Sequence, residues 1–136
     1  MQRVLVTGGA GFIGSHLVDR LMNEGHEITV LDNLSNGTLE NMRSGRFVFV
    51  KGDLKDRLVV EANVDNFDLV FHFAANPEVH VGETDPSTHL NENVLATFNL
   101  LEAMRKSKRA KTIVFASTST IYGEASVIHT PENYGV

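Results

Sequence analysis

Thr7-Gly8-Gly9-Ala10-Gly11-Phe12-Ile13-Gly14 is the stretch that decides the fold of this chain. It follows an apolar run at residues 4–6 that is typical of a strand, and it precedes a segment with helical periodicity. Its glycines are spaced G-x-x-G-x-x-G, one position away from the usual G-x-G-x-x-G. Such a turn brings the backbone close to a pyrophosphate, and the helix that follows offers free N–H groups and a partial positive charge. The stretch therefore predicts a phosphate-binding turn, the alternative being a tight turn without a ligand.

The composition describes one globular domain rather than a nucleic-acid-binding or membrane protein. The 136 residues suffice for a single core, and 42% of them are hydrophobic. The net charge is −5, and the basic cluster at residues 105–111 lies at a predicted helix end, where cations complement the helix dipole. The chain has no cysteine, which excludes disulfides and thiolate metal sites. We expect no metal, no membrane span and a cytoplasmic protein.

Apolar runs alternate with helical periodicity along the chain and predict an α/β fold. Helices are expected after the glycine turn, at residues 55–65, and from Asp85 onward, with Asp85 as the N-cap and Pro86 as the first helical residue. Continuous apolar runs suit strands that are buried on both faces, and right-handed crossovers then give a Rossmann-type, doubly wound parallel sheet of order 3-2-1-4-5. The five strands are expected at residues 2–7, 27–31, 47–50, 69–73 and 111–116.

Helical periodicity also predicts which faces of the helices are buried. Two stripes are expected to face the core, Ile13, Leu17 and Leu21 behind the glycine turn, and Leu58, Val59 and Ala62 in the next helix. The long helix carries a wider apolar surface that could serve both the sheet and a partner helix. Its members are Leu90, Val94, Phe98, Leu101 and Met104, with a second edge at Leu95 and Leu100.

Two carboxylates follow predicted strands at the edge where an open parallel sheet binds ligands. Asp32 lies 18 residues after Gly14 and is placed to bind the hydroxyls of an adenine ribose. Its charge would repel a 2′-phosphate, which favours NAD over NADP, although Asp32 could instead only begin the turn at residues 32–37. Asp53 could reach the adenine amino group or cap the helix that follows it.

The later strands supply small and hydroxylic residues to the same edge. Ala74 and Ala75 would let a cofactor lie close to the backbone, with residues 76–84 forming a loop over it. His72, inside a strand, is expected to be a hydrogen-bonded core histidine rather than a catalytic one. Asn93 interrupts the apolar surface of the long helix and is expected to anchor the neighbouring loop. The run Ser117-Thr118-Ser119-Thr120 follows the fifth strand, at the ligand-binding edge.

These motifs occur in the order seen in extended short-chain dehydrogenases/reductases. Within that family the chain most resembles the nucleotide-sugar epimerases of the UDP-glucose 4-epimerase type. The resemblance covers the whole chain and rests on the glycine stretch together with Asp32-Asn33-Leu34, Gly52-Asp53-Leu54, His72-Phe73-Ala74-Ala75, Asn93-Val94 and Ser117-Thr118-Ser119-Thr120-Ile121-Tyr122-Gly123.

The resemblance implies NAD as the cofactor and assigns residues to each part of it. The pyrophosphate would lie on Gly8, Gly11, Phe12, Ile13 and Gly14, the adenosine ribose on Asp32 and Asn33, and the adenine on Asp53 and Leu54. The nicotinamide ribose would lie along Phe73, Ala74 and Ala75, with Asn93 supporting that wall. Thr118 matches the catalytic Ser/Thr of the family, whose hydroxyl binds the reacting sugar hydroxyl.

The resemblance also implies that residues 1–136 are the N-terminal, NAD-binding Rossmann part of a longer enzyme. Neither Tyr122 nor Tyr134 has a lysine four residues later, so the family's Tyr-x-x-x-Lys helix, its sixth strand and its substrate domain would lie outside this chain. We therefore expect the chain to bind NAD without turnover. The parent protein would be a homodimer that acts on a nucleotide sugar, without nucleic-acid or membrane partners.

The resemblance favours an isomerase for the parent protein. Ser119 and Thr120 stand where the family's dehydratases carry Asp-Glu, so no acid is available there to eliminate water. The predicted reaction is the interconversion of C4 epimers of UDP-glucose and UDP-galactose type through a 4-keto intermediate. The alternatives are another enzyme of the same family that acts on nucleotide sugars, namely a dehydratase, a decarboxylase or a reductase, and a regulatory module that binds NAD without catalysis.

Overall fold

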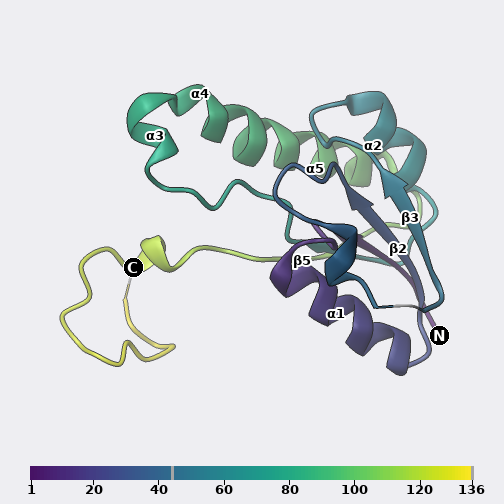
Figure 1. Ribbon diagram of the computed structural model, residues 1–136, viewed down its shortest axis with the longest axis horizontal. Helices are drawn as coiled ribbons and strands as arrows, with labels where there is room; N and C mark the ends of the chain where they lie inside the picture. The colour runs from purple at the N-terminus through teal and green to yellow at the C-terminus, as the bar shows by residue number, and fades with distance from the viewer. Residues whose placement is uncertain (44, 136) are drawn as a thin grey trace.

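A five-stranded parallel sheet forms the centre of the protein. The computed structural model describes residues 1–43 and 45–135 of the chain. The order of the sheet is β3-β2-β1-β4-β5, which confirms the predicted topology (Figure 1). Each end of each strand lies within one residue of its predicted position. The strands are β1 (Arg3–Thr7), β2 (Glu27–Asp32), β3 (Phe47–Lys51), β4 (Leu69–His72) and β5 (Thr112–Phe115).

Helices cover both faces of this sheet, so that β1 is buried on each side. Leu5 points into a core formed with helices α2 (Arg57–Val64) and α5 (Ala96–Lys106). Val4 and Val6 point into a second core beside helix α1 (Phe12–Asn23). These strand residues are fully buried, which explains why β1 is a continuous apolar run instead of an alternating one.

One long helix follows β4 and consists of three consecutive segments. These are α4 (Pro86–His89), a π-helical turn η2 (Leu90–Leu95), and α5. Pro86 begins the helix and the Asp85 carboxylate accepts a hydrogen bond from Ser87 N at 3.2 Å, which confirms the predicted cap. The loop expected at residues 76–84 is partly helical, because its last residues form α3 (Val81–Thr84). Two short 3₁₀ turns, η1 (Leu39–Asn41) and η3 (Ser119–Tyr122), complete the elements.

Two of the predicted buried faces are wrong in detail. Ile13 is 64% exposed, because it stands in the first turn of α1 beside the glycine turn. Leu21 is buried as predicted and Leu17 is half-buried, while Val18 takes the central buried position. In α2, Leu58 is 76% exposed and Ala62 is also exposed, while Val60 and Val64 face the core. Residues 58–60 are all apolar, so their pattern alone does not define which side of the helix is buried.

The long helix has two apolar faces, as its wide pattern predicts. Leu100 is fully buried and Met104 is nearly so, which places Met104 on the inner face and not on the stripe assigned to it from the sequence. The outer face stays open to solvent over Leu90, Val94, Phe98 and Leu101. We call these four residues the outer stripe. After β5 the chain runs away from the sheet, and η3 is the only element among the described residues that follow (Figure 1).

Candidate functional site

The glycine turn packs directly against the end of β4. Gly8 has a φ of +70°, and a Cβ at this position would lie 2.5 Å from Ala74 N. A Cβ at Gly14 would collide with Gly8 O, so the first turn of α1 rests on the glycine turn itself. Gly8 N donates to Leu31 O at 3.0 Å, which joins the turn to the end of β2. Side chains at Gly8 and Gly14 would therefore collide with the protein's own backbone, so these glycines are what allow the turn to pack closely against the end of β4 and the start of α1.

The start of α1 presents backbone donors without a competing charge. Gly11 is the N-cap and lacks a side chain that could bind the first N–H groups. The first turn, residues 12–15, is uncharged, so the positive end of the helix dipole is not neutralised within it. Phe12 and Ile13 are 78% and 64% exposed. This arrangement suits a phosphate group that lies against the N–H groups of Phe12, Ile13 and Gly14.

Asp32 both begins a turn and faces the ligand edge of the sheet. Its side chain is buried, with Oδ2 accepting from Ala10 N at 3.0 Å and Oδ1 accepting from Leu34 N at 2.8 Å. The two interpretations that the sequence left open are therefore compatible. Each carboxylate oxygen accepts up to two hydrogen bonds, so both retain capacity for a ribose hydroxyl.

Asp53 is held in place by its neighbours and does not cap the helix. Its Oδ1 accepts from Lys55 N at 2.8 Å, and its Oδ2 accepts from Asn33 Nδ2 at 3.1 Å. Burial raises the pKa of Asp53, but the hydrogen bonds from Lys55 and Asn33 and the Lys55 charge outweigh it, and the pKa lies below its ordinary value. The cap of α2 is Asp56, which accepts from Leu58 N and Val59 N.

Asn93 anchors the segment that follows β4, as the sequence predicts. Its Oδ1 accepts from Asn76 N at 2.7 Å, and its Nδ2 donates to Asn76 O at 3.1 Å. The side chain of Asn76 donates in turn to Glu92 Oε2 at 2.9 Å. The segment at residues 73–76 is thus tied to the π-helical turn through both backbone and side-chain atoms.

His72 is a fully hydrogen-bonded core residue, which confirms its predicted role. The ring lies 2.7 Å from Thr7 Oγ1 through Nδ1 and 2.9 Å from Thr97 Oγ1 through Nε2. The Thr97 hydroxyl donates to Asn93 O at 2.6 Å, so it accepts from His72, which places the ring proton on Nε2. Nδ1 then accepts from the Thr7 hydroxyl. Burial lowers the pKa of His72 to about 4, so the ring is neutral at pH 7.

An open groove with a volume of about 100 Å³ lies along the carboxyl ends of the strands. It brings together most of the residues predicted from the sequence, namely Gly8, Asp32, Asn33, Asp53, Leu54, Phe73, Ala74 and Ala75. Five other residues predicted to bind the cofactor do not line it. Gly11 and Gly14 pack against Gly8, Phe12 and Ile13 lie in the first turn of α1, and Asn93 follows the lining residue Glu92.

The groove also has lining residues that the sequence analysis missed. They include Ser35, Asn36, Gly37, Lys55 and Glu92. The first three could have been predicted, because they belong to the polar turn that directly follows Asp32. Lys55 Nζ lies 3.5 Å from both Asp53 Oδ2 and Glu92 Oε1, across the rim of the groove, and these three charges come from separate parts of the sequence.

Thr118 is not brought to this groove. It is exposed, it begins η3, and its hydroxyl lies 2.9 Å from Thr120 Oγ1. Figure 1 shows this segment beyond the end of β5. Within the described ranges, residues 1–43 and 45–135, there is no cluster of three His, Asp or Glu side chains suited to a metal ion. The same ranges contain no helix with the length and apolarity needed to cross a membrane.

Comparison with known proteins defines the family. Residues 4–135 match the NAD dependent epimerase/dehydratase family. A bifunctional UDP-glucose 4-epimerase and UDP-xylose 4-epimerase of Arabidopsis thaliana is 36% identical over 98% of this chain and 41% of its own length.

Solved structures agree with this result. The crystal structure of a UDP-galactose 4-epimerase is 52% identical and superimposes with a TM-score of 0.85, over 97% of this chain and 43% of the other. The UDP-glucose 4-epimerase of Stenotrophomonas maltophila, solved with NAD and formylated UDP-arabinopyranose, is 32% identical with a TM-score of 0.88, over 98% of this chain and 42% of the other.

The chain therefore belongs to the NAD-dependent epimerase/dehydratase family. Its fold is the Rossmann-type α/β fold of the epimerases that it matches. It spans about two fifths of the length of these relatives, between 41% and 43%.

Proposed function

We propose that the groove binds NAD and that the chain is the cofactor-binding part of a nucleotide-sugar 4-epimerase. The observation that carries this proposal is the convergence of Gly8, Asp32, Asp53 and Ala74 on one groove at the strand ends. The turn without side chains suits a pyrophosphate, and the buried carboxylate suits a ribose. Relatives named as UDP-glucose and UDP-galactose 4-epimerases support the reaction class.

Each part of the groove would hold one part of the cofactor. The N–H groups of Phe12, Ile13 and Gly14 would bind the pyrophosphate, since the start of α1 carries no negative charge. Asp32 would accept hydrogen bonds from the adenosine ribose, and Asp53 from the adenine amino group. The Ala74 and Ala75 backbone, without bulky side chains, would lie along the nicotinamide ribose.

The proposed reaction inverts C4 of a UDP-sugar, with UDP-glucose and UDP-galactose as the proposed pair. NAD held in the groove would supply reversible hydride acceptance at that carbon, while the hydroxyl proton would pass to the tyrosine of the Tyr-x-x-x-Lys helix that the resemblance places outside this chain. Thr118 is the residue of this chain proposed to touch the substrate, by binding the reacting hydroxyl. The cytoplasmic location expected from the sequence stays a prediction.

The proposed parent protein is a homodimer that pairs along the outer stripe. Leu90, Val94, Phe98 and Leu101 are 60%, 59%, 57% and 46% exposed and lie on one side of the long helix. Contiguous apolar surface of this kind is typical of an interface. Size-exclusion chromatography with light scattering tests this, and a parent protein that stays monomeric after purification argues against it.

Calorimetric titration of the chain with NAD and with NADP tests the cofactor assignment. We expect saturable binding of NAD and at least about tenfold weaker binding of NADP, because the Asp32 charge faces the ribose. Asp32→Asn keeps the size of the side chain and removes the charge, so it should narrow this preference. Failure to bind NAD, or tighter binding of NADP, would overturn the proposal.

A further inference from the structure

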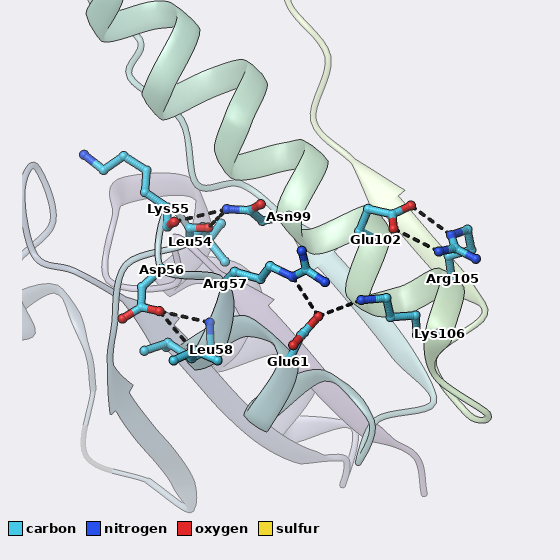
Figure 2. A network of polar contacts seen from close by, with 11 residues as sticks. Leu54, Lys55, Asp56, Arg57, Leu58, Glu61, Asn99, Glu102, Arg105 and Lys106 are labelled. Atoms are coloured by element: carbon cyan, nitrogen blue, oxygen red, sulfur yellow. Dashed lines mark hydrogen bonds and ion pairs between the residues drawn. The ribbon is translucent and has the colours of Figure 1, made fainter.

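Asn99 is a buried polar side chain that the proposed function does not use. It lies in the middle of α5 with 7% of its surface exposed. Its amide group leaves its own helix and donates to Leu54 O at 2.9 Å and to Lys55 O at 3.1 Å (Figure 2). These two carbonyls belong to the turn between β3 and α2, about 45 positions away in the sequence. Both hydrogens of the amide are therefore committed to one distant turn.

This turn is the part of the backbone that carries Asp53. Within it, Asp53 O accepts from Asp56 N, and Asp56 O accepts from Val60 N at the start of α2. The two carbonyls between them point toward α5 and are bound by Asn99. If either carbonyl rotated away from Asn99, it would lose its hydrogen bond, which is unfavourable away from solvent. The Asn99 amide therefore fixes the orientation of the peptide groups of Leu54 and Lys55.

Apolar packing of the Leu54 side chain against α5 holds the same turn. Leu54 is 5% exposed and belongs to the core cluster that contains Ala96 and Leu100 of α5. Leu54 and Ala96 both line the groove. The helix thus contacts the turn twice, through the backbone by Asn99 and through the Leu54 side chain. These contacts fix the backbone from which Asp53 projects and the position of Lys55 N, which binds the Asp53 carboxylate together with Asn33.

We propose that Asn99 is a positioning residue for base recognition, which aims Asp53 at the exocyclic amino group of adenine. This inference rests on the proposed NAD binding. Asn99 itself does not touch the ligand. Its contribution is expected at the adenine end of the groove and not at the nicotinamide end, where the segment at residues 73–76 is anchored separately by Asn93.

The test compares NAD with nicotinamide hypoxanthine dinucleotide, in which a carbonyl oxygen replaces the adenine amino group. The intact chain should bind NAD more tightly, because a carboxylate accepts from an amino group and repels a carbonyl. Asn99→Leu keeps the size of the side chain and removes both donors. We expect its NAD affinity to fall about fivefold to tenfold, with less than about a twofold change for the hypoxanthine analogue.

Asn63→Leu is the matched control. Asn63 also donates its amide to a backbone carbonyl, Val59 O at 2.8 Å, but this bond lies within α2. The control should keep the NAD preference of the intact chain. Equal weakening of both dinucleotides in Asn99→Leu would overturn the positioning role, whereas an intact chain that binds no NAD would overturn the proposed function instead.

A second measurement uses the unaltered chain and decides the case in which Asn99→Leu fails to fold. The side-chain amide resonances of Asn99 are followed by NMR during titration with AMP and with nicotinamide mononucleotide. AMP, which fills the adenine end, should shift them, and nicotinamide mononucleotide should leave them in place. No response to AMP, or the same response to both, would overturn the proposal.

Discussion

The segments that follow β1, β2, β3 and β4 are braced by hydrogen bonds to neighbouring elements, whereas among the described residues the segment that follows β5 is bonded in this way only at Ala116, whose N–H donates to His72 O at 3.1 Å. At the braced ends, Asp32 binds the glycine turn, and Asn93 binds the segment after β4. Beyond β5, the Thr118 hydroxyl bonds to Thr120 and the Thr118 carbonyl accepts from Ile121 N, so its contacts with described residues stay within its own short turn. The difference teaches that this chain shapes the proposed cofactor groove with its own contacts, whereas the described contacts of its proposed catalytic hydroxyl stay within one exposed turn.

Among the segments that follow β1 to β4, which we call the braced side, substitution at Gly8 should have the largest effect on stability and NAD binding. Gly8→Ala requires a positive φ in a residue with a side chain and brings its Cβ to 2.5 Å from Ala74 N. We expect the free energy of unfolding to fall by about 3 kcal/mol and NAD binding to be lost. Urea denaturation and calorimetric titration measure the two effects.

Gly25→Ala is the control that separates backbone strain from the collision. Gly25 has a φ of +80°, but an added Cβ there meets open space among the described residues. Its expected loss is about 1 kcal/mol, from strain alone, with NAD affinity unchanged. Equal losses in the two variants would show that the glycine turn is not packed against the end of β4.

A second effect on the braced side depends on pH. His72 has a pKa of about 4 in the folded protein and about 6.5 in the unfolded chain. Between these two pH values the unfolded chain binds a proton at His72 and the folded chain does not, so acid favours unfolding. The stabilisation that the neutral His72 gives to the folded state is complete above pH 6.5 and is lost as the pH falls toward 4. We expect the free energy of unfolding to be about 2 kcal/mol lower at pH 5 than at pH 7 on account of His72.

His72→Gln provides the reference for this effect. A glutamine can donate and accept hydrogen bonds but does not titrate over this range. At each pH, the free energy of unfolding of this variant is subtracted from that of the intact chain. The difference removes the contribution of the carboxyl groups, several of which have lowered pKa values and also lose stabilisation in acid. Parallel curves for the two proteins between pH 7 and pH 5 would contradict the buried neutral histidine.

The sequence was sufficient to predict the braced side because its signals are local. Apolar runs defined the strands, and the spacing from Gly14 to Asp32 placed the glycine turn and the Asp32 carboxylate at one edge of the sheet, where the proposed pyrophosphate and ribose contacts lie. His72 was correctly placed in the core because a lone histidine in an apolar run is most simply a buried, hydrogen-bonded residue.

What the sequence could not predict depends on contacts between distant segments. Asn99 is an ordinary residue in a helical pattern, and its partners become visible only when α5 packs on the turn after β3. Residues 58–60 are all apolar, so only the contact of α2 with α5 selects Val60 as the buried one. The π-helical turn likewise leaves no period by which the sequence reveals it.

The smallest effect is expected at Thr118, and it completes the comparison when paired with Thr7. Thr7→Val removes a buried hydroxyl that bonds to His72 at 2.7 Å and should lower the free energy of unfolding by about 1–3 kcal/mol. Thr118→Val removes an exposed hydroxyl and should change it by less than about 0.5 kcal/mol, with NAD affinity unaltered. In the parent protein the same substitution should reduce kcat, because the proposed contact with the sugar hydroxyl is lost. Thermal unfolding, NAD titration and an epimerase assay separate these outcomes. A Thr118→Val variant with weaker NAD binding would mean that the end of β5 belongs to the cofactor groove after all, and unchanged turnover in the parent would remove Thr118 from the reaction.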